Sequence, residues 1–277
     1  MTKITTLLAV ALIGLGLAGP AVAQDKSTEI VKQHWSFAGP FGTFDQNQLR
    51  RGFEVFQQVC SNCHSARLLA FRNLSEPGGP EFTAAQVKAL AATYTVLDPD
   101  ADGGKRPGLP SDAWPGPPQS PADLKAAFGI VPPDFSVLAK ARTVEEQGFN
   151  WVFNYFTTYA EGGPDYIHGL LNGYQDPPPA GVKVPDGKFY NAIFPAHFIG
   201  MPPPLTDGAV KYTPAADGST VPMTVDQYSR DAAAYMMWMA APHLDDTKSA
   251  GFRVLTFLIL FAILMWLVKR RIWRNAH

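Results

Sequence analysis

The stretch Cys60-Ser61-Asn62-Cys63-His64 constrains this chain most, because it contains both cysteines of the sequence and a histidine directly after them. Cysteines three positions apart share one helix face, so both sulfurs can bond neighbouring vinyl groups at one porphyrin edge. The following histidine can then reach under the ring and ligate the iron. The spacing predicts one covalent haem c, held by Cys60, Cys63 and His64, and a fold that wraps this flat group.

Three other chemistries use closely spaced cysteines, and the sequence opposes each of them. A zinc site takes about four ligands, and the chain has no third cysteine. A thioredoxin-like dithiol follows a strand, whereas the pattern before Cys60 is helical. A disulfide is the ordinary expectation for two cysteines in an exported chain, but His64 favours haem attachment.

The first 23 residues have the pattern of a secretory signal peptide. Lys3 precedes an apolar run over residues 4–18, and Ala21-Val22-Ala23 matches the small-x-small site that signal peptidase cuts. The run is shorter than the roughly 20 residues that span hydrocarbon. We expect residues 1–23 to be removed and residues 24–247 to form a periplasmic domain.

A second apolar run lies near the C-terminus. Residues 254–268 are apolar except for Thr256, and Arg253 can extend its charged head toward the interface. Counted from position 249, the segment gives roughly 30 Å of helix, which matches a bilayer core. Residues 269–274 then include four basic side chains, which stay on the inner side of a membrane and would serve no purpose after a buried core helix. We predict one transmembrane anchor at 248–268 and a cytoplasmic tail at 269–277.

This topology changes the meaning of the net charge of −1. All 24 acidic residues but only 16 of the 23 basic residues lie between Asp25 and Asp246, so this part carries a formal charge of −8. An acidic domain attracts basic partners. We therefore expect no nucleic acid as a ligand.

The second axial ligand of the iron has to come from another part of the chain. Met201 lies in Gly200-Met201-Pro202-Pro203-Pro204, where glycine allows close approach to the ring and the prolines stiffen the loop. Met/His ligation raises the reduction potential and suits electron transfer. The residues favour Met201. The alternatives that remain open are Met223, which we expect to pack before a helix, His168 and His197.

The remaining methionines are disfavoured as axial ligands because they lie in the signal peptide, in the anchor, or on a helix where we expect them to pack. They are Met1, Met265, Met236, Met237 and Met239.

Helices dominate the pattern. The capping residues Asp45 and Thr224 predict helices that run to Cys60 and to Pro242. Weaker helical patterns lie at 83–95, 121–128, 135–142, 149–159 and 165–174, separated by loops rich in proline and glycine. No strand alternation is strong enough to assign, and the acidic run at 98–102 is expected to be solvated surface.

Several further segments resemble the cytochrome c1 family, whose members are the haem subunits of cytochrome bc1 complexes. The resemblance covers most of the mature chain and ends in the single C-terminal anchor. It rests on Leu49-Arg50-Arg51-Gly52, the Cys60–His64 motif, Pro133-Asp134-Phe135-Ser136, Ala139-Lys140-Ala141-Arg142, Leu170-Leu171-Asn172-Gly173-Tyr174, Gly200-Met201-Pro202-Pro203-Pro204 and Trp238-Met239-Ala240-Ala241-Pro242.

The resemblance implies a mainly α, class I cytochrome c-like domain with long loops, plus one transmembrane helix. It implies Met201 as the axial ligand and Arg142 as the partner of a haem propionate. The segment at 145–163 looks longer than the family pattern.

The resemblance also implies a place in a quinol:cytochrome c oxidoreductase of the respiratory or photosynthetic chain, in a bacterial inner membrane. The partners implied are cytochrome b, a Rieske iron-sulfur protein as electron donor, a cytochrome c as acceptor, and membrane lipid. Alone, such a chain is not an enzyme. The alternatives are another membrane-anchored c-type cytochrome (an oxidase subunit or tethered carrier), an enzyme or sensor with an open iron, and an anchor with a vestigial haem.

Overall fold

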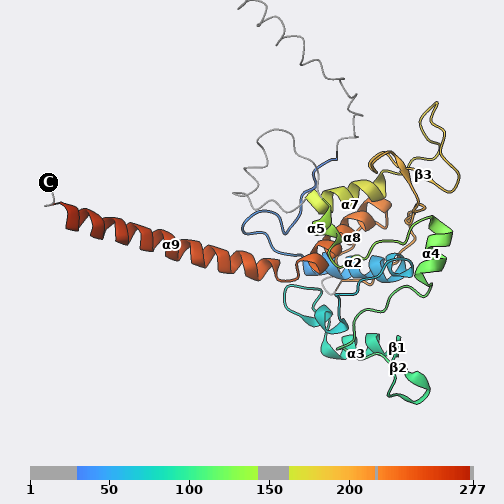
Figure 1. Cartoon of the computed structure of the whole chain (residues 1–277), viewed down its shortest axis with the longest axis horizontal. Helices are drawn as coiled ribbons and strands as arrows, with labels where there is room; N and C mark the ends of the chain where they lie inside the picture. Colours follow the sequence, from blue (N-terminus) through green and yellow to red (C-terminus); the bar gives the residue numbers. More distant parts are fainter. Residues whose placement is uncertain (1–29, 143–161, 216–217, 275–277) are drawn as a thin grey trace, which may run out of the picture.

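The computed structural model describes residues 30–142, 162–215 and 218–274. These residues form a mainly helical domain from which one long helix leaves (Figure 1). The expected mainly α fold with one apolar C-terminal helix is confirmed. The predicted signal peptide, its cleavage site and the helical pattern at 149–159 lie outside the described residues.

Helix α2 (Gln46–Gln58) forms where its capping pattern predicts it. The Asp45 carboxylate accepts a hydrogen bond from the Gln48 N–H at 2.9 Å and so caps the first turn. The buried face carries Leu49, Gly52, Phe53, Val55 and Phe56. After the helix, the 3₁₀ turn η1 (Cys60–Asn62) begins almost at once, so the cysteine motif directly continues a core helix.

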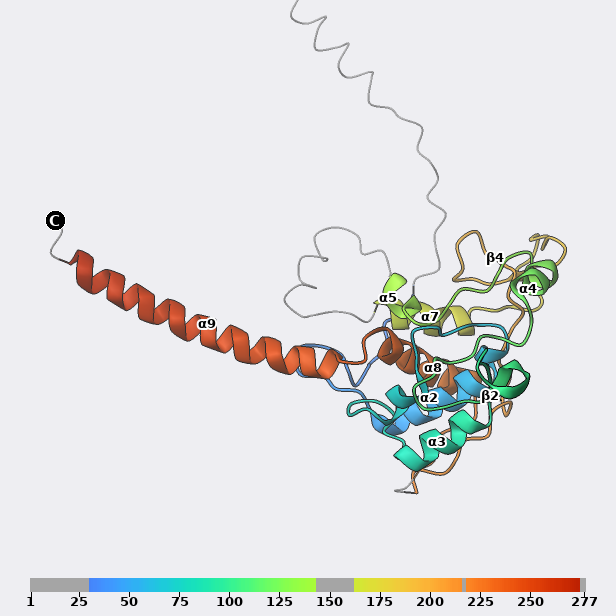
Figure 2. The same ribbon diagram turned by 60° about the horizontal axis from the view of Figure 1, so that its bottom comes forward.

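Helix α8 (Val225–Ala240) packs against α2 in the middle of the domain (Figure 2). Thr224 caps it by accepting from the Gln227 N–H at 3.4 Å. The two helices approach each other closely at Gly52. A Cβ at this position would collide with the backbone carbonyl oxygen of Asp231. Only glycine allows this approach without moving one helix.

A buried carboxylate ties these two helices together. Asp231 of α8 is fully buried and accepts a hydrogen bond from Arg51 Nε of α2 at 2.9 Å. The Tyr212 hydroxyl and the Gln227 amide also donate to it, at 2.8 and 2.9 Å. Because a buried charge destabilises a fold unless it is paired and hydrogen-bonded, this network favours one particular pairing of α2 with α8.

The other helices of the domain surround this pair. They are α3 (Ala84–Ala92), α4 (Pro121–Phe128), α5 (Leu138–Ala141) and α7 (Gly162–Asn172). Helix α7 packs along α8, α5 touches both of them, and α3 packs on the 3₁₀ segment η2 (Phe71–Ser75). The helix expected at 135–142 is reduced to the single turn of α5, because residues 133–136 bond instead to His64 and to the residues that directly follow it.

Two short antiparallel pairs were not expected from the sequence. Strand β1 (Thr95–Leu97) pairs with β2 (Lys105–Pro107), and β3 (Phe189–Tyr190) pairs with β4 (Phe198–Ile199). Strands of two or three residues are too short to show alternation. The acidic run expected as solvated surface forms the turn between β1 and β2, which includes η3 (Asp102–Gly104). Its Asp98 is not merely solvated, because it accepts from Arg106 Nε at 2.7 Å.

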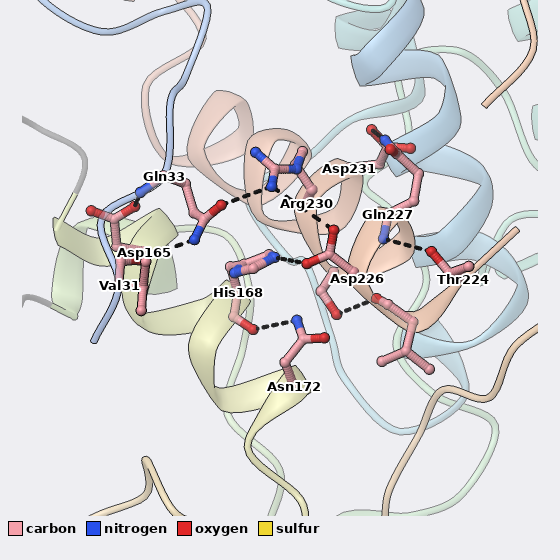
Figure 3. Close-up of polar contacts among 12 residues, drawn as sticks. Val31, Gln33, Asp165, His168, Asn172, Thr224, Asp226, Gln227, Arg230 and Asp231 are labelled. Carbon is pink, nitrogen blue, oxygen red and sulfur yellow. Dashed lines mark hydrogen bonds and ion pairs between the residues drawn. The ribbon is translucent and has the colours of Figure 1, made fainter. Parts of the chain in front are cut away.

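Residues 30–44, the N-terminal strap, run across the helices before α2 begins. The Gln33 N–H and the Trp35 Nε1–H donate to the buried Asp165 of α7 at 2.9 and 2.8 Å. Arg230 of α8 donates to the Gln33 side chain at 2.7 Å (Figure 3). The strap therefore joins α7 to α8.

Helix α9 (Leu244–Trp273) leaves the domain after the three-residue link 241–243. It has 30 residues and a mean hydropathy of 2.3 in its apolar window, and its side chains are exposed from Ser249 onward, whereas Leu244, Asp245 and Lys248 in its first turns are partly buried. At about 1.5 Å per residue it is longer than the roughly 30 Å of a hydrocarbon core. An exposed apolar helix of this length is a single-pass membrane anchor, as expected from the sequence.

Candidate haem site

The two cysteines lie in one tight turn at the end of α2. The N–H groups of Cys63 and His64 both donate to the carbonyl oxygen of Cys60, at 3.1 and 2.9 Å. The half-buried thiols are not joined in a disulfide. Burial raises the pKa of the Cys60 thiol to about 12, whereas reactive dithiols need a low pKa. The raised pKa of Cys60 disfavours the redox dithiol.

The imidazole of His64 is held in one orientation. It is only 8% exposed, its Nδ1 lies 2.8 Å from the carbonyl oxygen of Pro133, and its ring stacks on Phe135 with centroids 4.1 Å apart. A carbonyl can only accept, so Nδ1 carries the proton and Nε2 keeps its lone pair. Burial also lowers the pKa of His64, which favours the neutral ring. This is the state in which histidine ligates a metal.

The segment that holds His64 is itself fastened to the cysteine motif. The Phe135 N–H donates to the Ser65 carbonyl at 2.7 Å, and Asp134 accepts from the Ser65 hydroxyl at 2.7 Å and the Arg67 N–H at 3.0 Å. Burial acts to raise the pKa of Asp134, but hydrogen bonds from Ser136, Arg67 and Ser65 outweigh it and lower this pKa. A charged carboxylate therefore fixes the loop behind the imidazole.

Met201 comes from the long connection between α7 and α8. It is half-buried, and its backbone carbonyl accepts a hydrogen bond from the Tyr174 hydroxyl at 3.1 Å. Four residues later, Leu205 is buried in one apolar cluster with Val55, and Cys60 packs against the same cluster. The fold thus brings the Met201 loop to the end of α2 that carries the cysteine motif.

Asn191 shapes the loop that leads to Met201. Its fully buried side chain accepts from the N–H groups of residues 193–194 at 3.0 and 3.1 Å and donates to the Leu170 carbonyl at 2.8 Å. Gly200 is needed here for a reason other than the expected approach to the ring, because a Cβ would lie 2.7 Å from the carbonyl oxygen of Phe128. The glycine therefore seats this loop on the end of α4.

The alternative sixth ligands differ in how far their contacts oppose ligation. His168 is buried and its Nε2 lies 2.9 Å from Asp226 Oδ1 (Figure 3). His197 has its Nδ1 3.3 Å from the Asn191 carbonyl, at a left-handed φ of 61°. Met223 does not pack as expected, because it is 44% exposed and lines a groove along the start of α2. The contact with Asp226 disfavours His168, whereas the Nδ1 contact of His197 does not by itself exclude this residue. Met201 remains the best candidate because its loop packs on the cluster that Cys60 also contacts.

The methionines assigned to packing are confirmed as core residues. Met236 and Met237 are buried and Met239 packs partly buried against the same core.

Arg142 is exposed at the end of α5, close enough to Tyr166 for its charge to act on that phenol. Burial raises the pKa of Tyr166, and the charge of Arg142 opposes this effect. Burial and the neighbouring Tyr166 likewise raise the pKa of Tyr174, which reaches the Met201 loop. The charge of Arg142 thus acts on Tyr166, which neighbours the tyrosine that binds the Met201 carbonyl.

These residues fit a haem c. Two unpaired sulfurs and an oriented, neutral imidazole lie within one turn, and a thioether loop packs on the same end of α2. Among the described residues no three His, Cys, Asp or Glu side chains gather as a metal site.

Sequence reasoning did not assign the residues that support the ligands. The carbonyl of Pro133, the ring of Phe135, the Tyr174 hydroxyl and the Asn191 amide each act across a long stretch of chain. The motifs around three of them were noted, but spacing carries no signal for contacts between residues 69 positions apart.

Taken together, the helical domain, the cysteine–histidine turn at the end of a core helix and the apolar anchor define a membrane-anchored cytochrome of the c type. A model of the cytochrome c1 family matches residues 35–276. The chain belongs to the cytochrome c1 family, whose members are haem proteins of electron transport.

Its relatives are similar over nearly the full chain. It is 47% identical to cytochrome c1 of Blastochloris viridis over 94% of this chain and 92% of that one. It is 35% identical to cytochrome c1 of Cereibacter sphaeroides, over 95% and 93%. It is also 45% identical to cytochrome b/c1 of Bradyrhizobium diazoefficiens over 98% of this chain, which spans only 39% of that longer protein.

Proposed function

We propose that the chain is the haem subunit of a quinol:cytochrome c oxidoreductase. In this role it accepts single electrons from a Rieske iron-sulfur protein and passes them to a cytochrome c. The observation that carries the proposal is the Cys60–His64 turn with its oriented imidazole, in a chain of the cytochrome c1 family. A relative from Candida albicans, 38% identical, is named as the catalytic subunit of a cytochrome b-c1 complex, which supports a complex with cytochrome b.

Each site residue has a distinct task in this proposal. Cys60 and Cys63 would hold one haem c through thioethers, and His64 would ligate the iron through Nε2 while the Pro133 carbonyl holds its ring. Met201 would supply the second axial ligand, and Arg142 would pair with a propionate. When bound, the haem supplies a one-electron iron couple. The chain itself sets ligand identity, ligand orientation and burial, which tune that couple.

The proposed topology places residues 24–247 in the periplasm and residues 269–277 in the cytoplasm of a bacterium. A formal charge of −8 over residues 25–246 attracts a basic cytochrome c and raises its rate of encounter. The basic residues after position 268 hold the inner end of α9. Residues 1–23 act as the signal peptide that exports the domain.

Isolation of the intact complex tests this function. The full chain carrying a C-terminal tag is purified from mild detergent, and its companions are identified by mass spectrometry. We expect a cytochrome b and a Rieske protein in equal amounts, and reduction of the haem by a quinol only when the Rieske protein is present. Purification with terminal oxidase subunits instead would show that the chain is another kind of anchored cytochrome.

A further inference from the structure

The N-terminal strap is fastened to the first turns of α9 as well as to the helical domain. Lys248 Nζ donates to the carbonyl oxygens of Phe37 and Gly42, at 2.5 and 3.2 Å. The Phe44 N–H donates to Asp245 Oδ2 at 3.2 Å. The strap turn at 40–43 is thereby held beside the helix as it leaves the domain (Figure 2).

The tip of this turn is an exposed aromatic side chain. Phe41 is 75% exposed, and its ring meets Phe252 of α9 edge-on, with centroids 5.6 Å apart. Phe252 is itself 56% exposed. Two phenyl rings from distant parts of the chain thus form one apolar surface that the described residues leave open.

Phe252 marks the outer end of the membrane-spanning part of α9. The next residue, Arg253, donates to the Ser249 hydroxyl one turn back at 2.8 Å, so its charge is directed away from the apolar run. From Val254 onward the helix is apolar as far as Val268 except for Thr256. Since charged heads extend to the interface and apolar residues enter hydrocarbon, the boundary lies at Phe252. Phe41, in contact with Phe252, lies at the same depth.

A hollow of about 320 Å³ lies between the strap turn and α9. It is lined by Pro40, Phe41, Gly42, Thr43, Asp245, Lys248, Ser249, Phe252 and Arg253. Its lining has two cations, Lys248 and Arg253, and one carboxylate, Asp245. The rings of Phe41 and Phe252 can contact acyl chains. This combination suits the phosphate and upper acyl region of a phospholipid.

We propose that the strap turn is a second membrane contact of this chain, in which Phe41 enters the lipid leaflet on the side of the helical domain. The occupant of the apolar surface is lipid, because the bilayer that surrounds Phe252 necessarily reaches a side chain in contact with it. Anchoring at α9 and at Phe41 fixes the tilt of the domain over the membrane. This inference depends on α9 as a membrane span and not on the electron-transfer route.

A nitroxide placed at position 41 tests the contact. The full-length, haem-loaded chain carrying Phe41→Cys is spin-labelled in phosphatidylcholine nanodiscs, and collision rates are measured with oxygen, which concentrates in lipid, and with a water-soluble nickel chelate. The control is Leu97→Cys, because Leu97 is apolar and 77% exposed but lies in the β1–β2 hairpin. We expect the oxygen-to-nickel ratio at position 41 to exceed that at position 97 several-fold. Equal ratios would overturn the proposal and would leave a protein partner as the cover of Phe41.

Hydrogen exchange of unlabelled protein gives an independent result if the added cysteine disturbs haem attachment. Wild type and Phe41→Ser are compared in the same nanodiscs, with the haem spectrum as a check of folding. We expect the amides of residues 37–44 to exchange several-fold faster in Phe41→Ser, and those of residues 95–107 to be unchanged. Identical exchange of residues 37–44 in the two proteins would refute a lipid contact at Phe41.

Discussion

The two sides of the candidate haem site are built differently. The side with the cysteine motif continues a core helix, and its histidine is held by a backbone carbonyl and a stacked ring. The side with Met201 is a loop whose nearest regular structure is the two-residue strand β4, and a single tyrosine hydroxyl holds the carbonyl of Met201 itself. The cysteine side is therefore part of the packed helical core, whereas the Met201 side is a loop that packs on this core.

This difference indicates that attachment of the haem and adjustment of its reduction potential depend on different parts of the chain. Changes near the cysteine motif should decide whether the group is present. Changes in the loop should alter its potential while the group remains bound. Changes at the α2–α8 crossing should alter stability and leave both properties alone.

The largest effect is expected when both thiols are removed. Cys60→Ala combined with Cys63→Ala should abolish covalent attachment, because no other cysteine can form a thioether. Extraction with acidic acetone should then remove all haem, whereas wild type and the control Ser61→Ala should keep it. Haem that survives extraction in the double variant would show that attachment does not use this motif.

Replacement of Met201 by leucine should lower the potential and leave the haem attached. Leucine keeps the volume and removes the sulfur. Axial ligands act over roughly 0.8 V, so we expect a fall of a few hundred millivolts, with about 59 mV for each tenfold change in equilibrium. The reduced variant should also bind carbon monoxide. Redox titration of Met223→Leu, at the exposed methionine, is the control. If only Met223→Leu changes its potential, the ligand assignment is wrong.

The α2–α8 crossing should affect stability alone. Arg51→Ala leaves the buried Asp231 without its cation and should cost about 3 kcal/mol, the low end for a broken buried pair, because Tyr212 and Gln227 still donate. Arg106→Ala removes the partly exposed ion pairs with Asp98 and Asp112 and should cost less than Arg51→Ala, because solvent screens these charges. Urea unfolding in detergent measures both free energies. A changed potential in Arg51→Ala would contradict the separation of stability from tuning.

The position of Met201 should depend on the residues that shape its loop. Asn191→Ala leaves the N–H groups of residues 193–194 without their acceptor and should cost about 1–3 kcal/mol. Because these bonds shape the chain before Met201, we also expect partial carbon monoxide binding to the reduced protein. Asn172→Ala, which removes only a bond to the His168 carbonyl, is the matched control. Carbon monoxide binding equal in the two variants would mean that Asn191 does not position Met201.

The smallest effect concerns acid and the β1–β2 hairpin. Hydrogen bonds from Arg106 and from the Leu109 N–H lower the pKa of Asp112 to about 2. A lowered carboxyl pKa stabilises the fold above the ordinary value near 4, and this contribution is lost as pH falls through about 2. The protection factors of residues 95–107, which compare hydrogen exchange with the intrinsic rate at each pH, should therefore fall between about pH 4 and 2. Asp112→Asn should exchange faster at neutral pH and lose this pH dependence.

Much of the helical frame could be predicted because its signals are local. Helix α4 begins after Ser120, whose hydroxyl caps it, and ends at Gly129 with a left-handed φ of 76°. Such caps are specified within four residues, and the same holds for α2 and α8. The short strands and the reduction of α5 could not be predicted, since they depend on pairings with distant segments.

The cysteine motif could also be predicted because its signal is local, whereas the rest of the site could not. The spacing of Cys60, Cys63 and His64 is contained in one turn. The Pro133 carbonyl, which decides the orientation of His64, lies 69 residues away. The pairing of His168 with Asp226, which removes a rival ligand, spans 58 residues and leaves no local trace.

The three-residue link between α8 and α9 has a mechanical consequence. Three residues reach at most about 10 Å, so the core helix and the membrane helix cannot move far apart. The short link therefore holds the domain at a nearly constant distance from the bilayer. Any carrier that exchanges electrons with this domain therefore has to move to it.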